Sequence, residues 1–162
     1  MLKHLLISLA FLMTLSAPVA AQDFQKGFAA YEAGDFATAL QEWTPLAEQG
    51  NVSAQYNLGT LYDSGKGAPQ DYKEAVKWYK LAAEQGYDYG QALLAKMYED
   101  GKGVLQDNVM AHMWYNIASA NGDTRAGEWR DETAGLMTPA AIEKAQAMAR
   151  ECMSSNYKKC GY

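Results

Sequence analysis

The sequence of 162 residues is short of basic residues and of histidine. It has 14 lysines and arginines against 19 aspartates and glutamates, which gives a net charge of −5 at pH 7. An acidic chain without a basic patch argues against binding to nucleic acid or to an anionic membrane surface. Beyond His4, the only histidine is His112, which leaves little for a histidine triad or a multi-histidine metal site. We therefore expect no catalytic residue, no metal and no cofactor, and hence no enzyme.

Long apolar runs are absent after residue 21, and the run before it is too short to span a membrane. Lys3 and His4 give a positive start, an apolar run follows, and small residues end at Ala21. This pattern predicts a secretory signal peptide over residues 1–21. Cleavage after Ala21 leaves 141 residues, enough for one domain. We expect an exported monomer in the periplasm, with secretion from the cell as the alternative and no membrane insertion after cleavage.

Cysteine is scarce too, because the chain has only Cys152 and Cys160. In an oxidising compartment, two cysteines this close in sequence predict a disulfide that closes a short loop. A zinc site is the alternative, but His112 is far away in sequence. Between the cysteines, Ser155 and Lys158 match the Ser-x-x-Lys pattern of penicillin-recognising enzymes, but the partner motifs of such enzymes are missing. We interpret this match as coincidence.

What the sequence does contain is a repeat of 36 residues. Residues 51–86 (repeat 1) and 87–122 (repeat 2) are identical at 13 of 36 positions. A fixed period in this range indicates a solenoid, in which each unit buries its apolar face against its neighbours. Such stacks usually present a surface to a partner.

Each repeat is predicted to form two helices, because apolar residues recur at spacings of three and four. Residues 54–63 and 71–85 show this pattern in repeat 1, with Asp71 as the N-cap of the second helix. The loop between them contains Gly65-Lys66-Gly67, and it recurs in repeat 2. A nucleotide-binding loop needs a different spacing and a preceding strand, so we interpret this loop as a structural connector.

These residues resemble a known family. Residues 54–67 read Ala-Gln-Tyr-Asn-Leu-Gly-x-Leu-Tyr-x-x-Gly-x-Gly, and residues 70–86 read Gln-Asp-Tyr-x-x-Ala-x-x-Trp-Tyr-x-x-Ala-Ala-Glu-Gln-Gly. This pattern is similar to the Sel1-like repeat, a relative of the tetratricopeptide repeat with a longer loop between its helices. The resemblance implies an all-α fold, a right-handed α/α superhelix of helix pairs with capping helices.

The flanking segments are predicted to cap the stack. Residues 22–50 lack the loop insertion and resemble a plain tetratricopeptide unit. Residues 123–162 follow the repeats less closely and are predicted to form C-terminal capping helices, one of them starting at Pro139 after the N-cap Thr138. The disulfide tail would then be fixed to the last helix.

The resemblance implies a protein that binds another exported or envelope protein and regulates it. First helices line the concave side in this family, so the predicted partner-binding residues are Tyr56, Thr60, Asp63, Lys96, Glu99 and Asp100. Two other functions stay open. One is a cell-wall-related binder or weak hydrolase acting on β-lactams or muropeptides. The other is a secreted effector that acts on a host cell.

Overall fold

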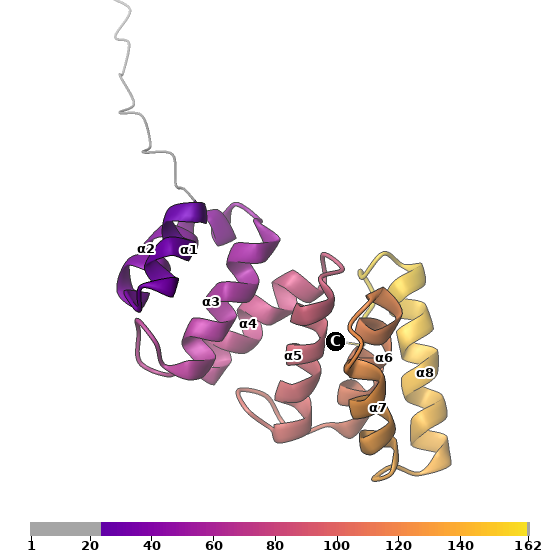
Figure 1. Ribbon diagram of the computed structural model, residues 1–162. Helices are drawn as coiled ribbons and strands as arrows, with labels where there is room; N and C mark the ends of the chain where they lie inside the picture. The colour runs from indigo at the N-terminus through magenta and orange to yellow at the C-terminus, as the bar shows by residue number, and fades with distance from the viewer. Residues whose placement is uncertain (1–23, 162) are drawn as a thin grey trace, which may run out of the picture.

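The computed structural model describes residues 24–161, and within them it contains eight α-helices and no strand (Figure 1). The first six helices form three successive packed pairs, and the last two helices each pack on the sixth. The bounds are Phe24–Glu32 (α1), Phe36–Glu48 (α2), Val52–Ser64 (α3), Tyr72–Ala83 (α4), Asp88–Asp100 (α5), Asn108–Asn121 (α6), Ala126–Ala134 (α7) and Pro139–Ser154 (α8). The predicted signal peptide, residues 1–21, lies outside the described residues.

The helices stack in chain order, so that α2, α4 and α6 each lie between the helix before and the helix after (Figure 1). Thus α4 packs on both α3 and α5, and α6 packs on both α5 and α7. The last helix, α8, covers α6 at the end of the stack. The predicted all-α solenoid of helix pairs is therefore confirmed.

The helix starts follow the capping residues that the sequence predicts. The Asp71 carboxylate accepts hydrogen bonds from the backbone N–H groups of Lys73 and Glu74, and Asp107 does the same at the start of α6. Thr138 caps α8, with Pro139 at its first position. Such caps satisfy backbone donors that have no partner inside the helix.

A buried glutamine ties each repeat to the unit before it. The side chain of Gln55 donates to the carbonyl of Ala47 at 3.0 Å, and that of Gln91 donates to the carbonyl of Ala83 at the same distance. Each glutamine oxygen in turn accepts from the end of its own repeat, from Gln85 and Asn121 respectively. Because a buried amide without partners is costly, this repeated network fixes how successive pairs dock.

The Gly-Lys-Gly loops also join neighbouring units. The loop of repeat 1 packs on the start of α2: a Cβ at Gly67 would lie 2.4 Å from the carbonyl oxygen of Phe36, and the Lys66 ammonium lies 4.9 Å from the Phe36 ring centroid. In repeat 2, Gly103 packs on the carbonyl of Tyr72 in the same way. Gly103 and Tyr72 each lie 36 residues after their counterparts Gly67 and Phe36. Only glycine permits so close an approach at the positive φ of these positions. The connector interpretation of the loop is thus supported by its contacts.

At the C-terminus the structure pairs Cys152 with Cys160 in a disulfide, and both half-cystines are buried. The closed tail brings Tyr157 against Gly86 at the end of repeat 1, where its hydroxyl accepts a hydrogen bond from Asn121 at 2.8 Å. The tail is therefore held against both repeats as well as against α8.

Candidate functional site

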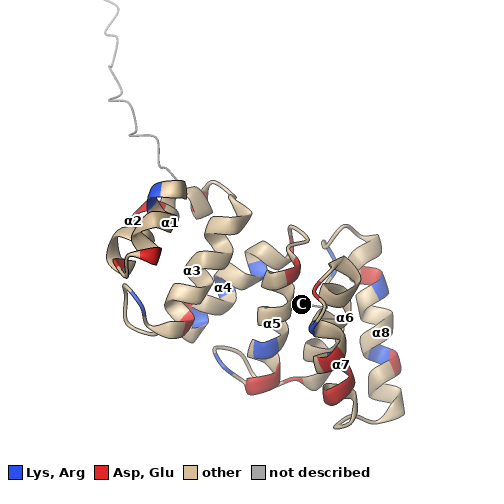
Figure 2. Ribbon diagram, in the orientation of Figure 1, with Lys and Arg blue, Asp and Glu red and all other residues tan. Residues whose placement is uncertain are grey.

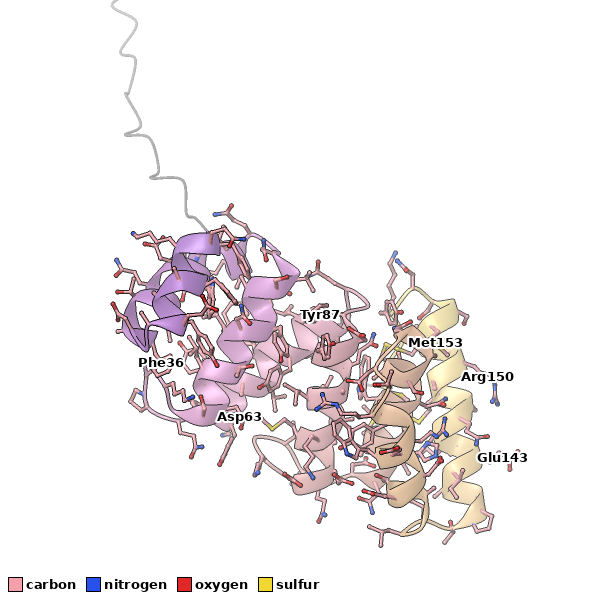
Figure 3. The ribbon with its side chains drawn as sticks, in the orientation of Figure 1. Phe36, Asp63, Tyr87, Glu143, Arg150 and Met153 are labelled. Carbon is pink, nitrogen blue, oxygen red and sulfur yellow. A yellow bond between two sulfur atoms is a disulfide. The ribbon has the colours of Figure 1, made fainter. Side chains whose placement is uncertain are left out.

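The six residues predicted to bind a partner all lie on the first helices of the two repeats. Tyr56, Thr60 and Asp63 follow one another along α3, and Lys96, Glu99 and Asp100 occupy the last turns of α5. We call the surface of α1, α3, α5 and α7 the first-helix face. Figure 3 shows Tyr87 and Asp63 at its two ends, and Glu143 and Arg150 on α8, away from it.

One end of the first-helix face carries a cluster of tyrosines. The ring centroid of Tyr56 lies 5.4 Å from that of Tyr87 and 6.2 Å from that of Tyr89, and the latter two are 5.8 Å apart. Partial burial raises the pKa of Tyr56 and of Tyr87, so both hydroxyls stay protonated at neutral pH. Tyr89 keeps 47% of its surface exposed. Exposed aromatic rings of this kind are typical anchors at protein interfaces.

Arg125, just before α7, packs on an aromatic ring of that helix. Its guanidinium lies 4.9 Å from the ring centroid of Trp129 and 4.0 Å from the Asp123 carboxylate, and its charge makes a small contribution that lowers the pKa of Tyr56. Sequence reasoning missed Tyr87, Tyr89, Arg125 and Trp129. A signal was present for the first two, because Tyr87 and Tyr89 stand where repeat 1 has Asn51 and Ser53.

The other end of the face carries a network of charges, which Figure 2 shows as adjacent blue and red bands at the C-terminal end of α5. The Lys96 ammonium lies 2.8 Å from the Glu99 carboxylate and 3.1 Å from that of Asp100, which is also 3.0 Å from Lys102. Bonding to Glu99 and then to Asp100 raises the pKa of Lys96. Burial opposes ionisation of Asp100, but Lys102 and Lys96 outweigh it and lower its pKa. These mutually compensated charges add little attraction for a ligand.

In repeat 2, the carboxylate on the first-helix face is engaged by hydroxyl groups of neighbouring helices. The Tyr115 hydroxyl donates to Glu99 at 3.2 Å. The Thr133 hydroxyl of α7 lies 3.0 Å from the other carboxylate oxygen and 2.8 Å from the carbonyl oxygen of Trp129, so its one proton is shared between these two acceptors. Glu99 thus joins α5 to α6 and α7. Its side chain is engaged within the fold, which the sequence alone did not indicate.

In repeat 1 the equivalent position is open. Asp63 replaces Glu99 and Tyr79 replaces Tyr115, but aspartate is shorter by one methylene group. The buried Tyr79 hydroxyl faces Thr60 and Asp63 and interacts with both, but within residues 24–161 neither contact has the geometry of a full hydrogen bond. Burial raises the pKa of Asp63, and the positive charge of Lys102 and the Tyr79 hydroxyl partly offset this effect. Repeat 1 therefore has a weakly bonded, buried hydroxyl beside a half-buried carboxylate.

The other residues considered for chemistry are engaged in the structure. His112 is buried in α6, and burial lowers its pKa, so the imidazole stays neutral at pH 7. The Ser155 hydroxyl donates to the carbonyl of Cys152 and accepts from the N–H of Lys159, which places it in the turn of the tail. Within the part of the chain that the structure describes, no three histidine, cysteine, aspartate or glutamate side chains form a group that could hold a metal ion. None of the described helices combines the length and apolarity needed to cross a membrane.

Comparison with known proteins places the repeats in a family. The family model of the Sel1 repeat matches residues 52–87 and 88–123. The fold is similar to the crystal structure of c5321, described as a protective antigen present in uropathogenic Escherichia coli strains and displaying an SLR fold. The two structures agree with a TM-score of 0.77, and the sequences are 27% identical over 81% of this chain. The chain covers only 30% of c5321. No curated protein matches the sequence.

A second solved structure agrees over most of its own length. The Sel1 repeat protein from Oxalobacter formigenes is 33% identical, with a TM-score of 0.62, and the match covers 71% of this chain and 89% of that protein. The agreement spans more than the two repeats, since it includes most of the helical stack.

Proposed function

The chain belongs to the Sel1 repeat family, whose members generally mediate protein–protein interaction, and we propose that it is an exported, non-enzymatic adaptor that binds a partner protein on its first-helix face. The family is typically a helical-repeat scaffold without catalysis. Export to the periplasm is supported by the signal-peptide pattern of residues 1–21 and by the disulfide between Cys152 and Cys160.

The observation that carries this proposal is the open position of repeat 1. A weakly bonded, buried hydroxyl, at Tyr79, lies next to Thr60 and the half-buried Asp63. A carboxylate accepts from a backbone N–H or a lysine ammonium. A polypeptide segment that donates to the half-buried Asp63 would therefore gain a charge-assisted hydrogen bond, whereas Glu99 in repeat 2 is already engaged by Tyr115.

The tyrosine cluster supplies the apolar part of the same surface. The exposed Tyr89 and the half-buried Tyr56 offer rigid aromatic area at low cost in conformational entropy, and Arg125 adds a planar cation whose charge reaches Tyr56. We infer a partner segment with an apolar side chain for the tyrosines and a backbone or lysine donor for Asp63. The residues of the proposed site are thus Tyr56, Thr60, Asp63, Tyr89 and Arg125.

Photo-crosslinking in living cells tests the proposal. A benzoylphenylalanine at position 89 should give one discrete adduct with another protein, whereas the same group at position 150, on the exposed surface of α8, should not. Asp63→Lys should remove the adduct at position 89 without changing the amount of folded protein. Fractionation of the cells and the medium locates the adduct.

Two results would contradict the proposal. Equal adducts from positions 89 and 150 would show that contact is not confined to the first-helix face. Absence of any adduct from position 89, together with one from position 150, would place the interface on the last helix instead.

A further inference from the structure

The second helices α2, α4 and α6 start at equivalent positions, but a loop of the following unit packs on the starts of α2 and α4 only. α2 begins at Phe36, α4 at Tyr72 and α6 at Asn108, at intervals of 36 residues. The Gly-Lys-Gly loop of the following unit covers the first two. Gly67 lies on the Phe36 carbonyl, and Gly103 lies on the Tyr72 carbonyl with the Lys102 ammonium 5.8 Å from the Tyr72 ring centroid.

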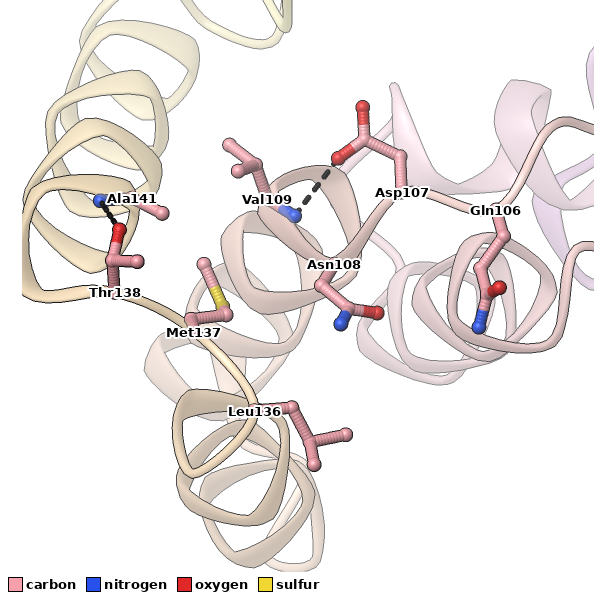
Figure 4. Close-up of a pocket in the computed structure, with 8 residues that line it drawn as sticks. All are labelled: Gln106, Asp107, Asn108, Val109, Leu136, Met137, Thr138 and Ala141. Atoms are coloured by element: carbon pink, nitrogen blue, oxygen red, sulfur yellow. Dashed lines mark hydrogen bonds between the residues drawn. The ribbon is translucent and has the colours of Figure 1, made fainter.

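The start of α6 has no such loop above it. The connection from α7 to α8 is residues 135–138, whereas the corresponding connection in repeat 1 is residues 65–71. The missing loop leaves a pocket of about 450 Å³, which we call the α6-start pocket (Figure 4). It is lined by Gln106, Asp107, Asn108, Val109, Leu136, Met137, Thr138 and Ala141.

The α6-start pocket exposes apolar side chains of the kind that a packed loop or ligand would bury. The amide oxygen of Asn108 is buried and has no hydrogen-bond partner within residues 24–161. Leu136 on its rim is 75% exposed, and Leu105, the residue before Gln106, is 90% exposed. Exposed leucines are costly in water, and this cost falls when a ligand covers them.

We propose that the α6-start pocket binds a loop of a partner protein that carries a glycine next to a lysine. The chain itself shows this mode of contact twice, at Phe36 and Tyr72. The glycine would approach the helix-start backbone as Gly67 and Gly103 do. A lysine ammonium would be attracted by the exposed carboxylate of Asp107, which caps the start of α6.

A second copy of this chain does not fit as the occupant. Both of its Gly-Lys-Gly loops are already packed on its own helix starts, at Phe36 and Tyr72. The pocket lies at the α7–α8 turn, and the groups that carry the proposal above, Tyr56 to Arg125, are not part of it. The two proposals therefore fail or succeed independently.

The test is a titration of isotope-labelled residues 22–162 with a capped peptide of residues 64–70, Ser-Gly-Lys-Gly-Ala-Pro-Gln, followed by backbone amide shifts. We expect a dissociation constant on the order of 1 mM, with the largest shifts at Asn108, Val109 and Met137. The Gly67→Val peptide and the Lys66→Glu peptide should bind at least about tenfold more weakly.

Matched variants of the protein locate the binding. Ala141→Trp fills the pocket and should abolish the shifts, whereas Ala140→Trp, at an exposed neighbouring position that does not line the pocket, should leave them. The proposal is overturned by the absence of shifts at about 10 mM peptide. It is also overturned by shifts centred on the first-helix face, by equal binding of the Gly67→Val peptide, or by self-association that depends on the pocket.

Discussion

Repeats 1 and 2 place the same tyrosine in the same position, but they differ in what its hydroxyl meets. In repeat 2 the Tyr115 hydroxyl donates to Glu99, which also binds Thr133 of α7. In repeat 1 the Tyr79 hydroxyl is buried, and among the described residues its contacts with Thr60 and Asp63 fall short of full hydrogen-bond geometry. The difference arises because glutamate is one methylene group longer than the aspartate of repeat 1 and because α7 lies beside it. The same position in a repeated unit can therefore make internal contacts in one copy and remain available to a partner in the other.

The largest expected effect tests whether the two repeats are equally packed. Trp114 is fully buried in the core of repeat 2, whereas Trp78 is 6% exposed and has the Lys77 ammonium 4.7 Å from its ring centroid. We expect Trp114→Ala to cost about 4–5 kcal/mol of unfolding free energy and Trp78→Ala about 3 kcal/mol. Urea unfolding measures both. A smaller loss for Trp114→Ala than for Trp78→Ala would show that the packing difference is wrong.

The next effect concerns the Gly-Lys-Gly loops, which should behave alike in both repeats. A Cβ at Gly103 would lie 2.2 Å from the Tyr72 carbonyl oxygen, so Gly103→Ala should cost about 3 kcal/mol, and Gly67→Ala a similar amount. Gly34 is the control: its φ is also positive, at 79°, but nothing lies within 4 Å of a Cβ placed there. Gly34→Ala should cost only about 1 kcal/mol. Equal losses at positions 34 and 103 would mean that the loop contact contributes nothing.

The carboxylates give the third comparison. Glu99→Ala leaves the buried Tyr115 hydroxyl without its acceptor, whereas Thr133 keeps the Trp129 carbonyl, so the change should cost about 1–2 kcal/mol. Asp63→Ala removes a carboxylate whose contact with Tyr79 falls short of full hydrogen-bond geometry and should change stability by less than about 0.5 kcal/mol. Thermal unfolding of the two variants side by side provides the measurement. If Asp63→Ala were the more damaging change, repeat 1 would be closed in the same way as repeat 2.

The smallest effect is a dependence on pH whose sign differs between the repeats, because the pKa of Asp63 is raised whereas that of Asp100 in repeat 2 is lowered. Burial raises the pKa of Asp63 above its ordinary value of 3.8, so ionisation of this group opposes folding. Its contribution to stability is complete below the unfolded pKa and is lost as the pH rises through the folded pKa. Relative to the wild type, Asp63→Asn should therefore gain melting temperature between about pH 3 and about pH 6. A constant difference across this range would remove the argument for burial of Asp63.

Much of the fold can be predicted from the sequence because the same pattern of apolar residues, caps and glycines occurs in both repeats. The period, the aspartate caps and the position of the glycines predict the helix pairs from local spacing. The docking of pairs is different, because it depends on contacts between units: the glutamine bonds of Gln55 and Gln91 and the approach of Gly103 to Tyr72 join residues that local patterns do not relate.

The candidate site could be predicted only in part. Its helices were identified, and Tyr56, Thr60 and Asp63 remain in the proposed site. The engagement of Glu99 could not be foreseen, since Thr133 belongs to a segment without the repeat pattern. Tyr87 and Tyr89 do not follow from the repeat pattern, because repeat 1 has Asn51 and Ser53 at these positions, at the very start of its first helix. In a repeat protein, the positions that break the pattern are therefore informative about binding.

The central claim is that the first helix of repeat 1 provides a binding surface around Asp63, whereas the equivalent Glu99 of repeat 2 makes contacts within the fold. The most direct test measures the affinity of the cross-linked partner for Asp63→Ala, Tyr89→Ala and, as a control on α8, Glu143→Ala. The account predicts that the first two variants bind at least about tenfold more weakly at unchanged melting temperature, and that the control binds as the wild type does. Affinities within about twofold for all three variants would contradict it.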